Sequence, residues 1–483
     1  MIQTPETLAR DVVDQCGNCN FCRELLADSP CMVFPKLYRL YDAEQAGRRA
    51  IAARELEALV TLCNMCGSCP CPSIRAKLRH ARDGFMAREG GLPLGLRLLN
   101  NVRLLGRLGG LFPRLSNYLM ETPPWAGLLR RLLGVHPERV VPAFPRDGFD
   151  AWARPRGHFA RTAAPGRKVA YFVGCSARYL FPEVAKATIQ VLERNGIAVH
   201  VPEQRCCGMP AMMEGERDAA FANVRFNMAQ LLDCVDAGYD ILFSCPTCCY
   251  MHKSVLRDGA HFSAQYRAYL QQELEREGGD LRRLAERIQQ GLAHGRHCGP
   301  PHSQTPMALK LVINGVCKDE GYFAELDGMA RMRLADHCWD LAEYLRRLKA
   351  EGAFNDRLGG LPESMAYYAP CHVKEQDMGR PWLDVLAAVP GLAVPEVGDM
   401  FDCCGSSGVR GFQCKFHKLS LVQGQPLMDK MRAADPDRIA TDCLSCRLQF
   451  NQALPHPVSH PAEILLAAYE SAERDSAAAP PGG

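Results

Sequence analysis

The 483-residue sequence lacks several features that mark common classes of protein. No uncharged apolar run approaches the roughly 20 residues that a membrane-spanning helix needs, so we expect no such helix. The first residues contain neither an apolar core nor a small-residue cleavage site, which argues against a secretory signal. The formal net charge of +3 is too small an excess to favour nucleic-acid binding.

The common nucleotide-binding loops are also missing. The sequence has no GxGxxG and no P-loop motif, and nothing else in it indicates a flavin or nicotinamide site. Any electrons that this chain handles must therefore arrive from a partner protein.

Cysteine, in contrast, is abundant, with 24 residues that are strongly clustered. We expect a cytoplasmic protein, and there structural disulfides are disfavoured and clustered cysteines serve as metal ligands or redox groups. Burial as small apolar side chains can account for Cys234, Cys338 and Cys414. It cannot account for closely spaced pairs flanked by glycine and proline.

Two CxxCxxC runs lie in the first 90 residues, at 16–22 and 63–69. This spacing lets one loop hold three corners of a [4Fe–4S] cubane, and in two-cluster ferredoxins the fourth ligand comes from the other run and precedes a proline. Cys71 precedes Pro72, and Pro35 follows shortly after Cys31. We therefore predict one cubane on Cys16, Cys19, Cys22 and Cys71, and a second on Cys31, Cys63, Cys66 and Cys69.

The two fourth ligands depart from the usual ferredoxin spacing. Eight residues separate Cys22 from Cys31, and one separates Cys69 from Cys71, where three are usual. Zinc is the alternative, because CxxC pairs also bind it tetrahedrally. Two triplets among eight cysteines fit two cubanes better.

Residues 168–252 and 365–450 are two copies of one unit. Each copy has a single cysteine, then Cys-Cys-Gly, then CxxC, and matching cysteines lie 196 to 198 residues apart. A cubane needs four ligands and each copy offers five, so an unusual cluster or a disulfide-forming redox site is indicated. The expected cytoplasmic setting and the nearby cubanes favour the cluster. The two sets are Cys175, Cys206, Cys207, Cys245 and Cys248, then Cys371, Cys403, Cys404, Cys443 and Cys446.

The local pattern of the repeated unit is α/β. In the first copy it predicts strands at 169–173, 197–201 and 241–244, and helices at 184–194 and about 218–234. The cysteines follow the carboxyl ends of these strands, where open parallel sheets place ligands. The fold class is therefore α/β, with a helical ferredoxin-like domain followed by two α/β domains with parallel sheets.

These motifs resemble the cysteine-rich CCG domain of heterodisulfide reductase-type proteins. The order of two ferredoxin motifs, a basic leucine-rich stretch and two CCG repeats is similar to the C-subunit family of anaerobic glycerol-3-phosphate dehydrogenases and to the D-subunit of heterodisulfide reductases. The resemblance covers about residues 10–470. It rests on Pro370-Cys371-His372, Cys403-Cys404-Gly405 with Gly411-Phe412, Thr441-Asp442-Cys443-Leu444-Ser445-Cys446, and His460-Pro461-Ala462-Glu463.

The resemblance implies that each set of five cysteines holds a noncubane [4Fe–4S] cluster. The cofactors would then be two cubanes and one or two noncubane clusters. The implied function is an electron-transfer subunit that relays electrons from a flavoprotein dehydrogenase toward a membrane quinone or a quinone-reactive subunit. The alternative is a heterodisulfide reductase-type subunit that reduces or forms a disulfide at a CCG cluster, and a zinc-bound interaction scaffold is a third interpretation.

Between the cysteine groups, residues 92–134 contain fifteen leucines, six arginines and one acidic residue. This composition suits either peripheral contact with an anionic membrane, here the inner face of the cytoplasmic membrane, or a connector whose leucines pack between domains. Prolines at 113, 123 and 124 rule out one long helix.

Two smaller features complete the prediction. His372 is a candidate proton donor to a thiolate product, although a structural role beside the cluster is the simpler interpretation. Cys298 and Cys317, with His297 and His302, lie in an apparent insertion and are a weak candidate metal site.

We expect five segments. They are a ferredoxin-type domain over 1–90, a connector over 91–165, a first CCG domain over 166–350 with an insertion at about 291–330, a second CCG domain over 351–470, and a disordered tail over 471–483.

Overall fold

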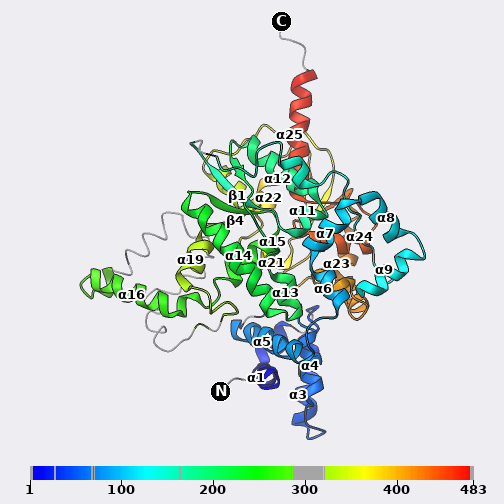
Figure 1. The fold of residues 1–483 in the computed structure, drawn as a ribbon, viewed down its shortest axis with the longest axis vertical. Helices are drawn as coiled ribbons and strands as arrows, with labels where there is room; N and C mark the ends of the chain where they lie inside the picture. The colour runs from blue at the N-terminus through cyan, green and yellow to red at the C-terminus, as the bar shows by residue number, and fades with distance from the viewer. Residues whose placement is uncertain are drawn as a thin grey trace.

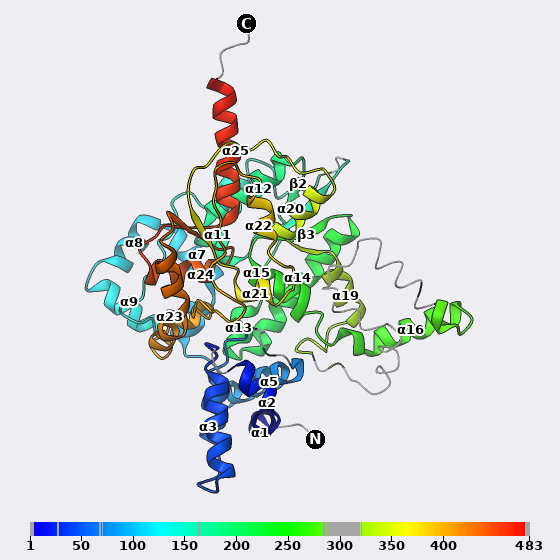
Figure 2. The ribbon, with the colours of Figure 1, turned by 180° about the vertical axis from the view of Figure 1, so that it is seen from behind.

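The computed structural model describes residues 4–26, 29–66, 69, 71–162, 165–283, 286, 319 and 321–478. The N-terminal helices lie at one end of the molecule, and α25 (Pro461–Ala478) projects from the other (Figure 1). The two sheets lie between these ends, and the connector helices flank them on one side. Figure 2 shows the same arrangement from behind.

The N-terminal region is helical. Its helices are α1 (Pro5–Gly17), α2 (Asn20–Leu25), α3 (Val33–Gln45), α4 (Ala53–Thr61) and α5 (Pro72–Arg88). Helix α1 begins where the Thr4 side chain accepts the Thr7 N–H, and it packs on α3, α4 and α5 through the buried Val12 and Val13. Six of the first eight cysteines lie between these helices, and the other two, Cys16 and Cys22, lie in α1 and α2.

The connector forms short helices, as its prolines predict. These are α6 (Leu94–Asn100), α7 (Val102–Leu111), α8 (Pro113–Glu121), α9 (Trp125–Leu133) and α10 (Phe149–Ala153). Pro113 is the first residue of α8, a position where its missing N–H costs nothing. No helix within the described ranges is long and apolar enough to cross a membrane.

The first repeat contains a four-stranded parallel sheet in the order β2-β1-β3-β4. Its strands are β1 (Lys168–Phe172), β2 (Ala198–His200), β3 (Asp240–Phe243) and β4 (Cys338–Asp340). The strands and helices predicted from its pattern are confirmed. Its helical segments are α11 (Cys175–Tyr179), α12 (Pro182–Arg194), α13 (Met209–Glu214), α14 (Arg217–Asp236), α15 (Pro246–Tyr250), η1 (Met251–Val255), η2 (Ala260–Phe262), α16 (Ala264–Arg276), α19 (Gly328–Asp336) and α20 (Leu341–Ala350).

The second repeat has the same architecture. Strands β5 (Met365–Tyr367), β6 (Arg438–Ala440) and β7 (Val458–Ser459) are parallel in the order β5-β6-β7. Bridges at Ala393 and Glu396 place a further extended segment beside β5, where β2 lies beside β1 in the first repeat. The helices are α21 (Cys371–Lys374), α22 (Pro381–Leu386), η4 (Gly408–Phe412), α23 (His417–Ala434), α24 (Leu444–Ala453) and α25.

The last helix of each repeat packs on the other repeat. Helix α20 of the first repeat packs on α22 of the second, and α25 of the second packs on α12 of the first. Tyr469 of α25 fixes this contact, because its hydroxyl accepts from the Asn195 side chain at 3.0 Å and donates to the Asn355 carbonyl at 2.7 Å. One hydrophobic core therefore runs through both repeats.

The predicted disordered tail is wrong over residues 471–478, since α25 continues to Ala478. Its inner turns pack on α12 and α22, and the helix continues outward past these contacts. The insertion cysteines and histidines at 297, 298, 302 and 317 lie outside the described residues.

Candidate cluster sites

Four of the N-terminal thiols, those of Cys16, Cys19, Cys22 and Cys71, surround one space. Burial, together with the neighbouring thiolates of Cys22, Cys71 and Cys19, raises the pKa of Cys16 to about 12. Burial likewise raises the pKa of Cys22 to about 11. Cys19 is the residue before α2, and Cys71 is the residue before α5, so two helix N-termini face this group. Helix N-termini favour negative charge.

The other four thiols form a second group. Burial raises the pKa of Cys31 to about 12, with Cys66 and Cys63 as the neighbouring thiolates. Burial also raises the pKa of Cys69, with further contributions from Cys63, Cys66 and Cys31. The sequence predicted this same partition into two groups of four.

In the first repeat, three loops at the carboxyl edge of the sheet bring five thiols together. Cys175 begins α11 just after β1, and its Sγ lies 4.0 Å from that of Cys206. Cys245 caps α15 just after β3. Hydrogen bonds from the Cys206 and Cys248 thiols lower the pKa of Cys207 to about 6.

The second repeat gathers its thiols in the same way. The Sγ atoms of Cys404 and Cys446 lie 3.0 Å apart, and the Gly405 N–H donates to the Cys403 sulfur at 3.3 Å. Cys371 begins α21 after β5, and Cys443 caps α24 after β6. Hydrogen bonds from Cys403 and Cys446 lower the pKa of Cys404 well below its ordinary value.

The five thiols of each repeat fit an iron–sulfur cluster. All described cysteines are free thiols, and soft thiolate donors select iron–sulfur clusters and other soft metals. Arg139 supports this fit in the second repeat, because its guanidinium is fully buried and its Nε and Nη2 have no hydrogen-bond partner among the described atoms. Burial lowers the pKa of Arg139 to about 10, and nearby Cys404 opposes that fall. An anionic cluster on Cys404 would provide the missing counter-charge.

His372 lies where three cysteine groups meet. Its Nδ1 accepts the Thr247 hydroxyl at 2.9 Å, and its Nε2 donates to the Met65 carbonyl at 3.2 Å. Thr247 belongs to the CxxC of the first repeat, and Met65 belongs to the second CxxCxxC run. The ring also stacks on Tyr250 with centroids 4.6 Å apart. Burial lowers the pKa of His372 to about 4, so the ring is neutral and both nitrogens are occupied.

The second N-terminal group adjoins the second repeat. Burial raises the pKa of Cys371 well above its ordinary value, and Cys66 is the first thiolate that adds to the rise. Cys66 also raises the pKa of Cys403. These electrostatic effects indicate that Cys66, one residue beyond Met65, lies near two cysteines of the second repeat.

Two buried arginines hold the same junction together, and the sequence patterns give no sign of them. Arg82 of α5 donates to the Cys63 carbonyl at 2.6 Å and to the Met213 carbonyl at 2.5 Å. Arg410 of η4 donates to the Thr61 carbonyl at 2.8 Å and pairs with Glu214 at 3.2 Å. Only the folded chain brings these residues, which are far apart in the sequence, to one place.

The cysteines that the sequence analysis assigned to burial differ in their exposure. Cys234 and Cys338 are fully buried, as their interpretation as buried small side chains predicts. Cys414 is exposed, so that interpretation is wrong there: the residue lies in the turn between η4 and α23, and its backbone N–H donates to the Gly134 carbonyl.

Comparison with known proteins agrees with this geometry. The cysteine-rich CCG domain matches residues 169–253 and 365–451. The chain therefore contains two CCG cysteine-rich domains. It is 23% identical over 373 residues to the anaerobic glycerol-3-phosphate dehydrogenase C-subunit of Escherichia coli K12, covering 77% of this chain and 76% of the relative.

Two further relatives match a smaller part of the chain. The B-subunit of the fumarate reductase (CoM/CoB) of Methanothermobacter marburgensis is 22% identical over 293 residues, which are 60% of this chain and 43% of the relative. Lactate utilization protein A 2 of Bacillus cereus AH820 is 19% identical over 310 residues, 62% of this chain and 97% of the relative. The CCG domains, the cysteine sets and these relatives together make this chain an iron–sulfur electron-transfer protein.

Proposed function

We propose that this chain is the iron–sulfur subunit of an oxidoreductase complex and carries electrons from a flavoprotein dehydrogenase to membrane quinone. The cubanes would be held by Cys16, Cys19, Cys22 and Cys71, and by Cys31, Cys63, Cys66 and Cys69. Each CCG repeat would hold a noncubane [4Fe–4S] cluster on its five cysteines. The relative from Escherichia coli, which belongs to a glycerol-3-phosphate dehydrogenase, makes a dehydrogenase of that kind the favoured donor.

The electrostatic influence of Cys66 on two cysteines of the second repeat carries this proposal. It supports electron transfer between the second cubane and the cluster on Cys371 and Cys403. His372 touches the loops of the second cubane and of the first repeat, so both repeats adjoin one entry point. We propose a structural role for His372 here, since neither ring nitrogen is free to move a proton.

A cavity supports quinone as the acceptor. Its volume is about 450 Å³, and it lies between the connector helices and the cysteine edges of both repeats. The walls are mostly apolar, and they include Cys175 of the first repeat and Ser445 of the second. An apolar pocket that reaches cluster loops suits an apolar electron acceptor.

The outer face of the connector supports membrane contact. Leu108, Leu111, Phe112, Leu115 and Leu132 are each more than half exposed. Arginines accompany them on the same helices, and this combination suits the interface of an anionic membrane. We propose peripheral binding to the inner face of the cytoplasmic membrane, with the cavity as the route for quinone.

The test is reoxidation of the dithionite-reduced protein by a short-chain menaquinone analogue, followed by stopped-flow absorbance. Val102→Trp narrows the cavity and should slow the reaction at least tenfold. Leu104→Trp, on the exposed side of the same helix, is the matched control. Equal rates in both variants and the wild type would overturn the cavity as the quinone site.

EPR of the oxidised protein with and without added thiol separates this function from disulfide chemistry. An electron carrier should show reducible cubane signals and no thiol response. A paramagnetic signal that appears only with thiol would place substrate chemistry on a CCG cluster and favour the heterodisulfide reductase-type activity. Both repeats keep all five cysteines, which is the observation that favours this second candidate.

A further inference from the structure

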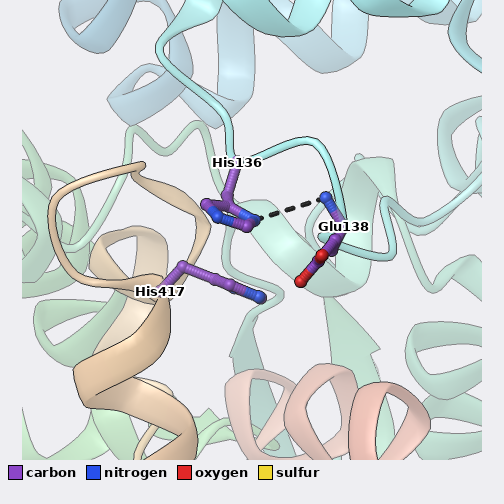
Figure 3. Close-up of side chains that lie close together, drawn as sticks. All are labelled: His136, Glu138 and His417. Atoms are coloured by element: carbon purple, nitrogen blue, oxygen red, sulfur yellow. Dashed lines mark hydrogen bonds between the residues drawn. The ribbon is translucent and has the colours of Figure 1, made fainter.

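Two histidines and a glutamate meet outside the cysteine groups. His136 and Glu138 follow α9, and His417 is the first residue of α23. One potential ligand atom from each lies within 4.8 Å of the other two. Figure 3 shows the Glu138 carboxylate close to the nitrogen-bearing tip of the His417 ring.

The backbone holds these residues in place. Val135 pairs antiparallel with Gln413, the His136 N–H donates to the Phe412 carbonyl at 2.8 Å, and the Cys414 N–H donates to the Gly134 carbonyl at 3.1 Å. The two imidazoles consequently stack, with centroids 4.0 Å apart and planes 17° apart. A strand-like contact between the connector and the second repeat thus fixes both rings.

The hydrogen bonds of His417 leave one nitrogen free. Its Nδ1 lies 3.4 Å from the Gly411 carbonyl, so Nδ1 carries the proton. Its Nε2 is buried, has no partner among the described atoms, and belongs to a side chain that is 1% exposed. Metal-binding histidines usually donate their other N–H to a carbonyl in this way, and a buried nitrogen without a partner is destabilising unless something binds it.

The other two side chains can complete such a site. The Nδ1 of His136 accepts the Glu138 N–H at 3.3 Å, a long hydrogen bond that a metal ion can replace. Glu138 is exposed and His136 is half-buried, so the site opens to solvent on their side. Water can therefore fill the remaining coordination position.

We propose that His136, Glu138 and His417 bind one Zn²⁺ ion, with water as the fourth ligand. Two imidazoles and a carboxylate are a frequent ligand set for zinc. The ion would link the connector to the second repeat independently of the iron–sulfur clusters, as a clamp over the wall of the apolar cavity, to which Val135 and Phe412 contribute.

The test is zinc binding to the anaerobically purified full chain, with its clusters verified by iron and sulfide content. After equilibration with Zn²⁺ at pH 7.5 and removal of free metal, elemental analysis should find one zinc per chain in the wild type. Titration should show at least tenfold weaker binding in His417→Ala and in Glu138→Gln. His456→Ala, which changes a histidine outside the site, should bind as the wild type does.

Glu138→Gln keeps the result interpretable, because an exposed side chain can change without loss of the fold. Zinc should also raise the thermal midpoint of the wild type and leave that of Glu138→Gln unchanged, with equal iron content in both. Zinc bound equally by the wild type and both site variants, or no retained zinc in the wild type, would overturn the proposal.

Discussion

The two CCG repeats hold their adjacent cysteines in different ways. In the first repeat, the Asn227 side chain accepts the Arg205 N–H at 2.8 Å and donates to the Cys206 carbonyl at 3.0 Å. In the second, Gly424 occupies the corresponding place on α23, and the helix backbone packs directly on Cys404. A side-chain amide in one copy thus corresponds to close backbone packing in the other.

The electrostatic surroundings differ as well. The groups that set the pKa of Cys207 are thiols, burial and a backbone N–H. Those that set the pKa of Cys404 include the buried guanidinium of Arg139. Because a nearby cation stabilises the more negative, reduced state of a cluster, a cluster in the second repeat should have the higher reduction potential. The two copies therefore share their ligands and differ in the setting of those ligands.

The largest expected effect is at Gly424. A Cβ there would lie 2.4 Å from the Cys404 carbonyl oxygen, a backbone contact that cannot relax without moving the cysteine loop. Gly424→Ala should abolish the cluster of the second repeat, measured as the loss of one cluster's iron and sulfide per chain. Gly110→Ala, where nothing lies within 4 Å, should keep the full content. Full iron content in Gly424→Ala would contradict close packing as the restraint.

Removing the buried guanidinium of Arg139 should change the reduction potential of the second-repeat cluster more than its iron content. Arg139→Gln should lower the reduction potential of the second-repeat cluster, by about 60 mV for each 1.4 kcal/mol of lost stabilisation. An EPR-monitored redox titration measures this shift. The exposed Arg131→Gln is the control, and its potentials should match the wild type. A shift confined to the first-repeat cluster would refute the assignment of Arg139 to the second.

Removing the side-chain amide of Asn227 should cause a milder defect in the first repeat. Asn227→Ala leaves the Arg205 N–H and the Cys206 carbonyl without these hydrogen bonds, at a cost of about 1–3 kcal/mol. The thermal midpoint should fall, and a chelator should remove iron from the first repeat faster. Arg225→Ala, on the exposed face of α14, should behave as the wild type. Faster loss from the second repeat instead would mean that the two restraints are coupled.

The smallest expected effect is a pH dependence of stability that arises at the contact between the repeats. The His460 Nε2 donates to the Ser244 carbonyl at 2.9 Å, and its Nδ1 accepts the Ala462 N–H at 3.0 Å. Burial lowers the pKa of His460 to about 4, below the value of about 6.5 in an unfolded chain. The unfolded state therefore binds more protons below pH 6.5, so stability is complete above that pH and is lost toward pH 4.

This loss amounts to about 2 kcal/mol at pH 5. Thermal midpoints at pH 7.5 and 5 should fall further in the wild type than in His460→Gln, which has no group that titrates there. An equal fall in both proteins would assign the pH dependence to other groups.

The sequence predicted the repeated architecture well because cysteine spacing and apolar periodicity are local signals. The strands at 169–173 and 241–244 and the partition of the eight N-terminal cysteines all follow from such signals. Cys414 shows the limit of such local signals, because the exposure of its side chain depends on how the connector packs against η4. Arg139, Arg410 and Asn227 gave no signal, because their roles arise from contacts with residues distant in the sequence.

The tail prediction failed for a related reason. Alanine and serine after residue 471 are typical of low-complexity segments, but this composition also continues a helix whose preceding turns are anchored on α12 and α22. Tertiary contact decided the outcome, and composition alone contained no information about it.

The exchange of α20 and α25 between the repeats has a consequence for biosynthesis. The face of α12 that α25 covers stays open until residues 461–478 have emerged from the ribosome, long after α12 itself has been made. A long-lived nascent chain with an uncovered apolar face is a substrate for chaperones. Completion of the core of the first repeat should therefore wait for the synthesis of α25.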